Sequence, residues 1–404
     1  MRWLRAIAPA LLGAVLLGSC AGAEPSGVPT ASASVTSHAG VPRQSRSPAG
    51  PAQVPPTPSP SPTSAARPSP TATAGRSSWA TGTPTVTPTL GPSPTTAPAS
   101  PTGPQVGHSA WVSVSVATLW RSPSSPRAVD QPALRNPAAI RQWLSAMTLD
   151  DRRGLDGRAD TQALLGERVL VTARSGAWVK VVVPDQPTPL DSRGYPGWVP
   201  AAQLTGTAPA AVALSATIVT KTAWLRTDDP AASAVVEVSY GTRLPRVGVS
   251  GNWVRVSTPT GRVLRVAASQ VSVTSPGVPA LPAGGSALVA SAEIFTGLPY
   301  LWAGTSGFGL DCSGLTSLVH RVHGVIIPRD ADAQAARGTP VSAGALRPGD
   351  LLFYATNGYV HHVSMYAGGG LMIQSPHTGG SVETIPMSTV DYAREFAGAR
   401  RYLG

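Results

Sequence analysis

One cysteine carries most of the chemistry that this sequence could perform. Cys312 lies in a glycine-rich stretch, residues 298–314, and is one of two cysteines among 404 residues. The other, Cys20, ends an apolar leader, so Cys312 would lack an intrachain disulfide partner after export, which is typical of a reactive thiol. Apolar residues follow it at helical spacing, namely Leu315, Leu318, Val319 and Val322. The pattern predicts that Cys312 begins a helix, where the helix dipole favours a thiolate.

A thiolate nucleophile needs a general base and a group that orients the base. The sequence predicts strands at residues 360–367 and 371–375, joined by three glycines. In a hairpin centred on Gly369, His362 and Gln374 share one face and lie diagonally across the ladder, whereas His361 points to the other face. We therefore expect His362 to be the base and Gln374 to be its partner.

Six short motifs then occur in order over about residues 284–404. They read Gly-Leu-Pro-Tyr-Leu-Trp, Asp-Cys-Ser-Gly-Leu, Ile-Pro-Arg-Asp-Ala-Asp-Ala-Gln, Leu-Arg-Pro-Gly-Asp-Leu-Leu-Phe, His-Val-Ser-Met-Tyr and Met-Ile-Gln-Ser. Their order and spacing resemble the NlpC/P60 family of cell-wall cysteine peptidases. The resemblance implies that Cys312 is the nucleophile, His362 the base and Gln374, at a position that is usually histidine, the orienting residue. It also implies that Tyr300 donates a hydrogen bond near the oxyanion.

The beginning of the chain resembles a bacterial lipoprotein signal. Residues 1–20 hold two arginines, an apolar run and the end Leu-Gly-Ser-Cys. The interpretation is cleavage before Cys20 and lipidation of that residue, which would anchor the protein on the outer face of the cytoplasmic membrane, facing the cell wall. The alternative is a signal peptide with an incidental cysteine.

Residues 21–106 are rich in Pro, Ser, Thr and Ala and predict a disordered linker.

Two copies of a small β-module are predicted between the linker and the catalytic domain, at residues 107–206 and 211–274. Glycine precedes the tryptophan of Gly-x-Trp-Val-x-Val by 12 residues in both, from Gly166 to Trp178 and from Gly241 to Trp253. The pattern resembles bacterial SH3-like (SH3b) barrels, and the first copy has an insert of helical periodicity at residues 130–160. The predicted fold is thus an α+β papain-like catalytic domain, at residues 284–404, preceded by two small all-β SH3-like barrels and the disordered linker.

The resemblance also implies a site for the substrate's amine. In NlpC/P60 enzymes with SH3-like domains ahead of the catalytic domain, the first such domain can wall off the cleft, and acidic and tyrosine side chains hold a free N-terminal amine. The residues that match these roles are Glu167, Tyr195, Asp311 and Ser313. For Glu167 and Tyr195, the alternatives are a solvated charge and a surface aromatic of the barrel. Arg329 and Asp330 are interpreted as a structural ion pair, and the alternative is that they line the cleft.

The net charge and the motifs of the sequence limit the classes of partner that the protein could bind. The net charge of +11 indicates anionic surroundings, such as wall polymers or lipid head groups, but no basic stripe with interleaved aromatics argues for nucleic acid. No His-x-x-x-His pair or other ligand spacing predicts a metal, and no cofactor is expected.

The resemblance implies hydrolysis of peptidoglycan stem peptides between γ-D-glutamate and the diamino acid, meso-diaminopimelate or L-lysine, in peptides with a free N-terminal L-alanine. Two alternatives stay open. One is an N-acetylmuramoyl-L-alanine amidase of the same fold. The other is a non-catalytic wall-binding lipoprotein in which the SH3-like domains bind the wall.

Overall fold

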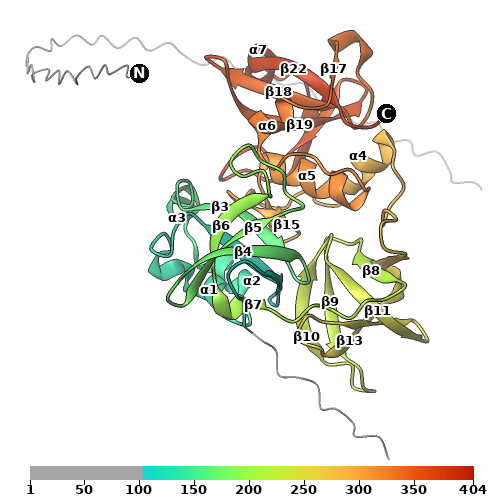
Figure 1. Ribbon diagram of the computed structural model, residues 1–404. Coiled ribbons are helices and arrows are strands. Elements are labelled where there is room, and N and C mark those ends of the chain that lie inside the picture. Colours follow the sequence, from blue (N-terminus) through green and yellow to red (C-terminus); the bar gives the residue numbers. More distant parts are fainter. Residues whose placement is uncertain (1–102) are drawn as a thin grey trace, which may run out of the picture. The chain divides into compact units, whose positions relative to one another are not determined.

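The computed structural model describes residues 103–404, which form two β-modules and a C-terminal domain (Figure 1). The predicted signal, the lipidation site Cys20 and the linker up to residue 102 lie outside the described residues. In the described part of the chain, no helix combines the length and the apolar character that a membrane span requires.

The first β-module is a seven-stranded sheet in the order β3-β2-β6-β5-β4-β1-β7. Its strands are β1 (Ser109–Val112), β2 (Val116–Trp120), β3 (Ala159–Leu164), β4 (Arg168–Ser175), β5 (Trp178–Val183), β6 (Tyr195–Pro200) and β7 (Leu204–Thr205). Between β2 and β3, the predicted helical insert contains α1 (Gln131–Leu134), α2 (Ile140–Ala146) and α3 (Leu149–Arg153). Ile140 and Trp143 are buried on one side of α2, and the Trp143 indole donates to Asp130 at 2.8 Å. The apolar face of the insert therefore serves packing.

The second β-module repeats the first strand for strand, in the order β10-β9-β13-β12-β11-β8-β14. Its strands are β8 (Ser215–Ile218), β9 (Thr222–Thr227), β10 (Ala234–Ser239), β11 (Arg243–Ser250), β12 (Trp253–Ser257), β13 (Val263–Ala267) and β14 (Val271–Thr274). Gly166 and Gly241 occupy equivalent turns with φ of 83° and 82°, a conformation that favours glycine. Trp178 and Trp253 begin the equivalent strands β5 and β12. The predicted repeat of two all-β modules is confirmed.

The C-terminal domain is α+β, as predicted. A six-stranded antiparallel sheet runs in the order β17-β22-β18-β19-β20-β21. Its strands are β17 (Thr339–Val341), β18 (Leu351–Thr356), β19 (Tyr359–Gly368), β20 (Leu371–Gln374), β21 (Glu383–Pro386) and β22 (Phe396–Arg401). The helices are α4 (Gly285–Glu293), α5 (Cys312–Val322), α6 (Ala331–Ala335) and α7 (Val390–Glu395), and a short hairpin joins β15 (Thr305–Ser306) to β16 (Gly309–Leu310). Helix α5 packs on β19, the strand that carries His362.

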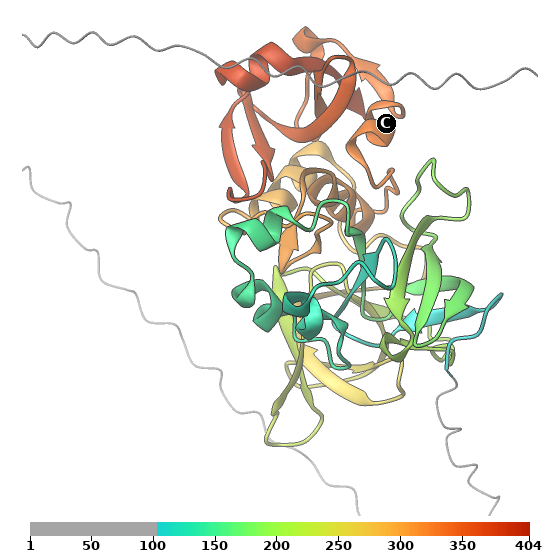
Figure 2. The same cartoon turned by 90° about the vertical axis from the view of Figure 1, so that its left-hand side faces the viewer.

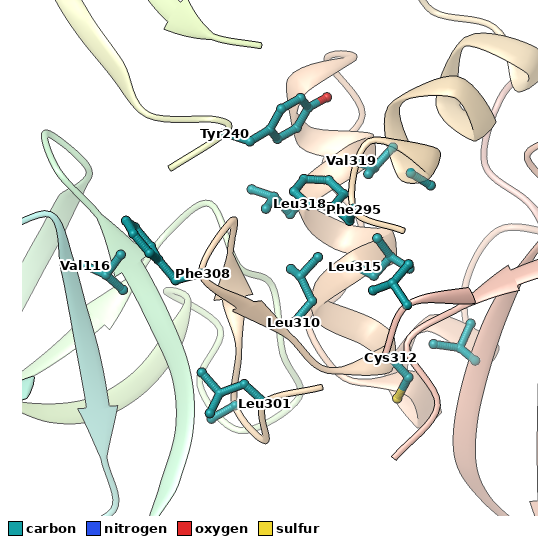
Figure 3. Close-up of a cluster of buried hydrophobic side chains, with 14 of the residues drawn as sticks. Val116, Tyr240, Phe295, Leu301, Phe308, Leu310, Cys312, Leu315, Leu318 and Val319 are labelled. Atoms are coloured by element: carbon teal, nitrogen blue, oxygen red, sulfur yellow. The ribbon is translucent and has the colours of Figure 1, made fainter. Parts of the chain in front are cut away.

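One of the four apolar clusters in the described part of the chain crosses all three of its parts (Figure 3). It joins Val116 of the first β-module and Tyr240 of the second to Phe295, Leu310 and Leu315 of the C-terminal domain. Figures 1 and 2 both show α5 between the C-terminal sheet and the β-modules. Burial of apolar surface is the main favourable term in folding, so the β-modules form part of the fold of the C-terminal domain.

Buried and partly buried hydrogen bonds also connect the three parts. The Trp302 indole donates to the Ala159 carbonyl at 2.9 Å. The backbone N–H of Gly307 donates to Ser239 at 2.8 Å, and the Ser306 hydroxyl donates to the Gln162 amide oxygen at 2.9 Å. The hairpin β15–β16 is thus bonded to both β-modules, which fixes its position beside α5.

We predict that residues 284–404 expressed alone do not form a soluble folded monomer. Removal of the β-modules would expose Leu318 and Val322 of α5, which lie against Gly241, and such apolar patches cause association. Size-exclusion chromatography and circular dichroism on this fragment test the prediction, with residues 103–404 as the matched control. A monomeric fragment that unfolds cooperatively at the temperature of the control would contradict it.

Candidate active site

Cys312 is the first residue of α5, so the predicted helix start is confirmed. Asp311 is the N-cap residue, and its carboxylate accepts the backbone N–H of Gly314 at 2.7 Å. A Cβ atom on Gly314 would collide with the carbonyl oxygen of Gly304, which explains glycine in this turn. Cys312 is a free cysteine, buried with 8% of its surface exposed, and its sulfur lies at the edge of the apolar core in Figure 3.

The surroundings of Cys312 favour the neutral thiol. Burial raises the pKa of the Cys312 thiol to about 12, and the negative charge of Asp311 acts in the same direction. Backbone N–H groups of Val363 and Ser313 and the charge of Arg329 lower this pKa by less. Desolvation therefore opposes the thiolate that the helix N-terminus favours. A neutral thiol must lose its proton to a base during the reaction.

His362 is placed to be that base. It lies on β19 next to Val363, whose backbone N–H contacts the cysteine sulfur. Its Nε2 is 2.7 Å from Oε1 of Gln374 on β20, so Nε2 carries the hydrogen and Nδ1 is free to accept a proton. Burial lowers the pKa of His362 to about 4, with a smaller opposing effect of the Gln374 hydrogen bond. The imidazole is thus neutral at physiological pH.

The predicted register of the hairpin is confirmed. Met365 pairs with Ile373, so His362 and Gln374 lie on the same face, diagonally across the ladder. His361 points to the other face and lies 3.2 Å from the Glu395 carboxylate near the surface. Two rings, those of Tyr354 and Tyr392, flank the His362 imidazole at centroid distances of 5.5 and 5.6 Å.

A buried ion pair adjoins the nucleophile. Arg329, with 1% of its surface exposed, donates to both carboxylate oxygens of Asp311, at 2.6 and 3.0 Å. The same guanidinium donates to the hydroxyls of Ser313 and Thr161 at 2.9 and 2.8 Å. The interpretation of Arg329 as a structural ion pair is correct, but its hydrogen-bonded partner is Asp311 and not Asp330.

Tyr195 and Asp330 meet on the other side of Arg329. Tyr195 begins β6 of the first β-module, is buried, and forms a side-chain hydrogen bond with Asp330. Burial raises the pKa of the Asp330 carboxyl to about 6, although Arg329 and Tyr195 lower it in part. Tyr195 therefore belongs to this site and is not a surface aromatic of the barrel. Asp330 is partly exposed and keeps free acceptor positions.

Glu167 does not belong to the site. Its carboxylate is 2.7 Å from Arg321, nine residues along α5 from Cys312, which corresponds to about 13 Å of helix rise. The other oxygen accepts the backbone N–H of Leu164 at 2.9 Å. The assignment of Glu167 to the amine site is wrong, and so is its alternative as a solvated charge, because it forms a largely buried ion pair that joins the first β-module to the end of α5.

Tyr300 lies on the nucleophile's side of the domain. It is buried and forms an isolated bridge with Leu310, two residues before Cys312. Burial raises the pKa of the Tyr300 hydroxyl, and the nearby Cys312 and Asp311 add to this effect. Its hydroxyl stays protonated, as a donor to an oxyanion requires.

Among residues 103–404, no group of three or more His, Cys, Asp or Glu side chains is arranged to hold a metal ion.

Comparisons with known proteins agree with this geometry. Residues 297–401 match the NlpC/P60 family, residues 218–273 match the YKFC SH3b2 domain, and residues 152–204 match the bacterial dipeptidyl-peptidase Sh3 domain. A γ-D-glutamyl-L-lysine dipeptidyl-peptidase of Bacillus cereus is 44% identical over 302 residues, which cover 72% of this chain and 90% of the relative. The chain belongs to the NlpC/P60 family.

Two further matches each cover more than two thirds of the chain. A γ-D-glutamyl-L-lysine dipeptidyl-peptidase of Bacillus subtilis is 41% identical over 295 residues, which cover 71% of this chain and 96% of the relative. The crystal structure of an NlpC/P60 family protein from Bacillus cereus aligns with a TM-score of 0.70 and 40% identity, covering 73% of this chain and all of that one. The protein is therefore an NlpC/P60 peptidase with two SH3b domains.

We predict that the two adjacent histidines differ in importance for this NlpC/P60 peptidase. His362→Ala should lower the rate of peptide hydrolysis at least 100-fold, because it removes the general base, whereas His361→Ala should keep more than half of the activity. Steady-state hydrolysis of a γ-D-glutamyl peptide measures both variants. Equal losses, or a larger loss for His361→Ala, would show that the imidazole of His362 is not the base.

Proposed function

We propose that this peptidase hydrolyses the bond between γ-D-glutamate and the diamino acid of peptidoglycan stem peptides that begin with a free L-alanine. The relatives named γ-D-glutamyl-L-lysine dipeptidyl-peptidase support the choice of bond. One structural observation supports the requirement for a free amine. Asp330, a partly exposed carboxylate, is hydrogen-bonded to Tyr195 and adjoins the Arg329–Asp311 pair that leads to Cys312.

The charges near Cys312 favour a cationic group at Asp330. Arg329 already neutralises Asp311 through two hydrogen bonds, so Asp311 has little capacity for a second cation. Asp330 accepts from the Tyr195 hydroxyl and keeps other lone pairs free for an ammonium group. With Glu167 excluded, the proposed amine site consists of Asp330 and Tyr195, and the Asp311–Ser313 segment holds the neighbouring part of the dipeptide.

The proposed mechanism starts from a neutral thiol and a neutral imidazole. As the sulfur of Cys312 attacks the γ-carbonyl carbon, its proton passes to Nδ1 of His362. The Tyr300 hydroxyl and the backbone N–H of Cys312 donate to the oxyanion. The imidazolium then gives its proton to the leaving amine of the diamino acid, and a thioester of L-alanyl-D-glutamate remains on the sulfur. Water, deprotonated by His362, hydrolyses the thioester and returns the thiol.

We predict that L-alanyl-γ-D-glutamyl-L-lysine is cleaved at least 100-fold faster, by kcat/KM, than the same peptide with an acetylated amine. Acetylation removes the positive charge that Asp330 would bind. Mass spectrometry of the products tests this, with intact sacculi as a third substrate. Release of the dipeptide from the free tripeptide alone is the expected result.

The other outcomes of that experiment identify the alternatives. Release of whole stem peptides from sacculi would indicate an amidase that cuts between muramic acid and L-alanine. Binding of sacculi without any product, unchanged in Cys312→Ala, would indicate a wall-binding protein. Equal cleavage of free and acetylated tripeptides would contradict the amine site but not the choice of bond.

We also predict that pH affects KM and kcat in different ranges. The α-amine is protonated below pH of about 8, so it binds an ionised Asp330. As pH falls through 6, Asp330 takes up a proton and KM should rise about tenfold, while kcat stays constant until His362 is protonated near pH 4. The charged or titratable groups next to Asp330 are Arg329, Tyr195, Asp311 and Asp332. Near pH 6, Arg329 stays positively charged and the Tyr195 hydroxyl stays neutral.

Asp330→Asn should raise KM at pH 7 and abolish its change near pH 6. Asp332→Asn is the matched control, since this exposed carboxylate lies two residues further on α6 and should leave both parameters within twofold. Steady-state kinetics between pH 4.5 and 8 measure these values. A KM that stays flat through pH 6 in the unmodified enzyme would refute the role of Asp330.

A further inference from the structure

Gln374 is hydrogen-bonded at both ends of its amide. Its Oε1 is 2.7 Å from Nε2 of His362, and its Nε2 donates to the carboxylate of Glu383 at 3.0 Å. Gln374 and Glu383 are directly paired residues of β20 and β21, so the sheet holds their side chains on the same face. Gln374 is fully buried and Glu383 is partly exposed. The three side chains form a continuous chain from the imidazole to a carboxylate.

The carboxylate of Glu383 selects one orientation of the amide. An ionised carboxylate only accepts hydrogen bonds, so it must face the NH₂ group of Gln374. The amide oxygen then faces His362 and accepts the hydrogen of Nε2, which leaves Nδ1 unprotonated. In the reversed orientation, the amide oxygen would face the carboxylate and the NH₂ group would face Nε2. The tautomer that a base requires therefore depends on Glu383.

Glu383 also provides the charge that Gln374 lacks. A carboxylate in the third position would stabilise the imidazolium that forms when His362 takes a proton, whereas a neutral amide provides only its dipole. Hydrogen bonds in series polarise one another, so a carboxylate on the NH₂ group makes the amide oxygen a stronger acceptor. In this arrangement the hydrogen on Nε2 stays on His362, and the carboxylate of Glu383 changes only how charge is distributed along the hydrogen-bonded chain.

The neighbouring rings protect this chain of hydrogen bonds. Tyr392 of α7 forms a side-chain hydrogen bond with Gln374, and its ring lies 5.6 Å from that of His362. Tyr354 of β18 covers the imidazole at 5.5 Å. Gln374 is fully buried, so the partners of its amide are these side chains and not water.

We infer that Glu383 is a positioning residue of the general base, which sets the orientation of the Gln374 amide and through it the tautomer and charge stabilisation of His362. This inference rests on the proposed roles of Cys312 and His362. It adds a fourth residue, on β21, to the three that the sequence indicates.

A double-mutant cycle tests the inference in the chain of residues 103–404. Glu383→Ala should lower kcat for L-alanyl-γ-D-glutamyl-L-lysine about tenfold and leave KM within twofold, as expected for an interaction that matters mainly in the transition state. In a Gln374→Ala background, Glu383→Ala should cost less than twofold, because the link to His362 is already absent. Glu383→Gln keeps an acceptor oxygen without the charge and should lose at least threefold.

The matched control is Glu395→Gln. This carboxylate is bonded to His361 and acts on His362 only through its charge, outside the hydrogen-bonded chain through Gln374, so its loss should change kcat less than twofold. Thermal unfolding of every variant checks the fold. Equal losses from Glu383→Ala in both backgrounds, a loss confined to KM, or unchanged kcat in Glu383→Gln would overturn the inference.

A second readout separates this inference from the proposed substrate. The rate at which iodoacetamide alkylates Cys312, followed by mass spectrometry of its peptide, needs no substrate but depends on His362 as the proton acceptor. Glu383→Ala should lower this rate at pH 7, and the loss should again vanish in Gln374→Ala. If the tripeptide is not cleaved but this pattern appears, the proposed substrate fails and the role of Glu383 stands; an unchanged alkylation rate refutes the role.

Discussion

The buried pair between Arg329 and Asp311 determines where the nucleophile lies. Both groups are almost fully buried, and each charge is acceptable there only because the other is present. Asp311 caps α5 directly before Cys312, while Arg329 also binds Thr161 of the first β-module and Thr305 of the β15–β16 hairpin. The position of the cysteine thus depends on a module that precedes it by more than a hundred residues. This dependence explains why one apolar core runs through all three parts.

Burial also sets the electrostatics of the reaction. The thiol of Cys312 and the imidazole of His362 are both kept neutral, since the apolar core disfavours either charge. The proton moves when the sulfur attacks, and the imidazolium that forms needs stabilisation at that moment. The chain through Gln374 to Glu383 lies where that stabilisation is required.

Local patterns in the sequence predicted the elements, and residues brought together by packing were harder to predict. The helical periodicity after Cys312 was sufficient to predict where α5 begins. The triglycine turn was sufficient to predict that His362 and Gln374 lie on the same face of the hairpin. Glu167 was misassigned because its neighbour Arg321 comes from another domain, and no local signal shows that contact. The burial of Cys312, which opposes ionisation of its thiol, was not predicted because periodicity does not show how deeply a helix end is buried. Glu383 was missed because residues 375–382, between β20 and β21, form an irregular loop whose length does not set the register of the two strands.

A crystal structure of Cys312→Ser with L-alanyl-γ-D-glutamyl-L-lysine would test the account most directly. We expect the ammonium group within hydrogen-bonding distance of the Asp330 carboxylate and the Tyr195 hydroxyl, with the γ-carbonyl carbon against the side chain of residue 312. The carbonyl oxygen should face the Tyr300 hydroxyl. An ammonium group in solvent or beside Glu167, or a different carbonyl at residue 312, would contradict the account.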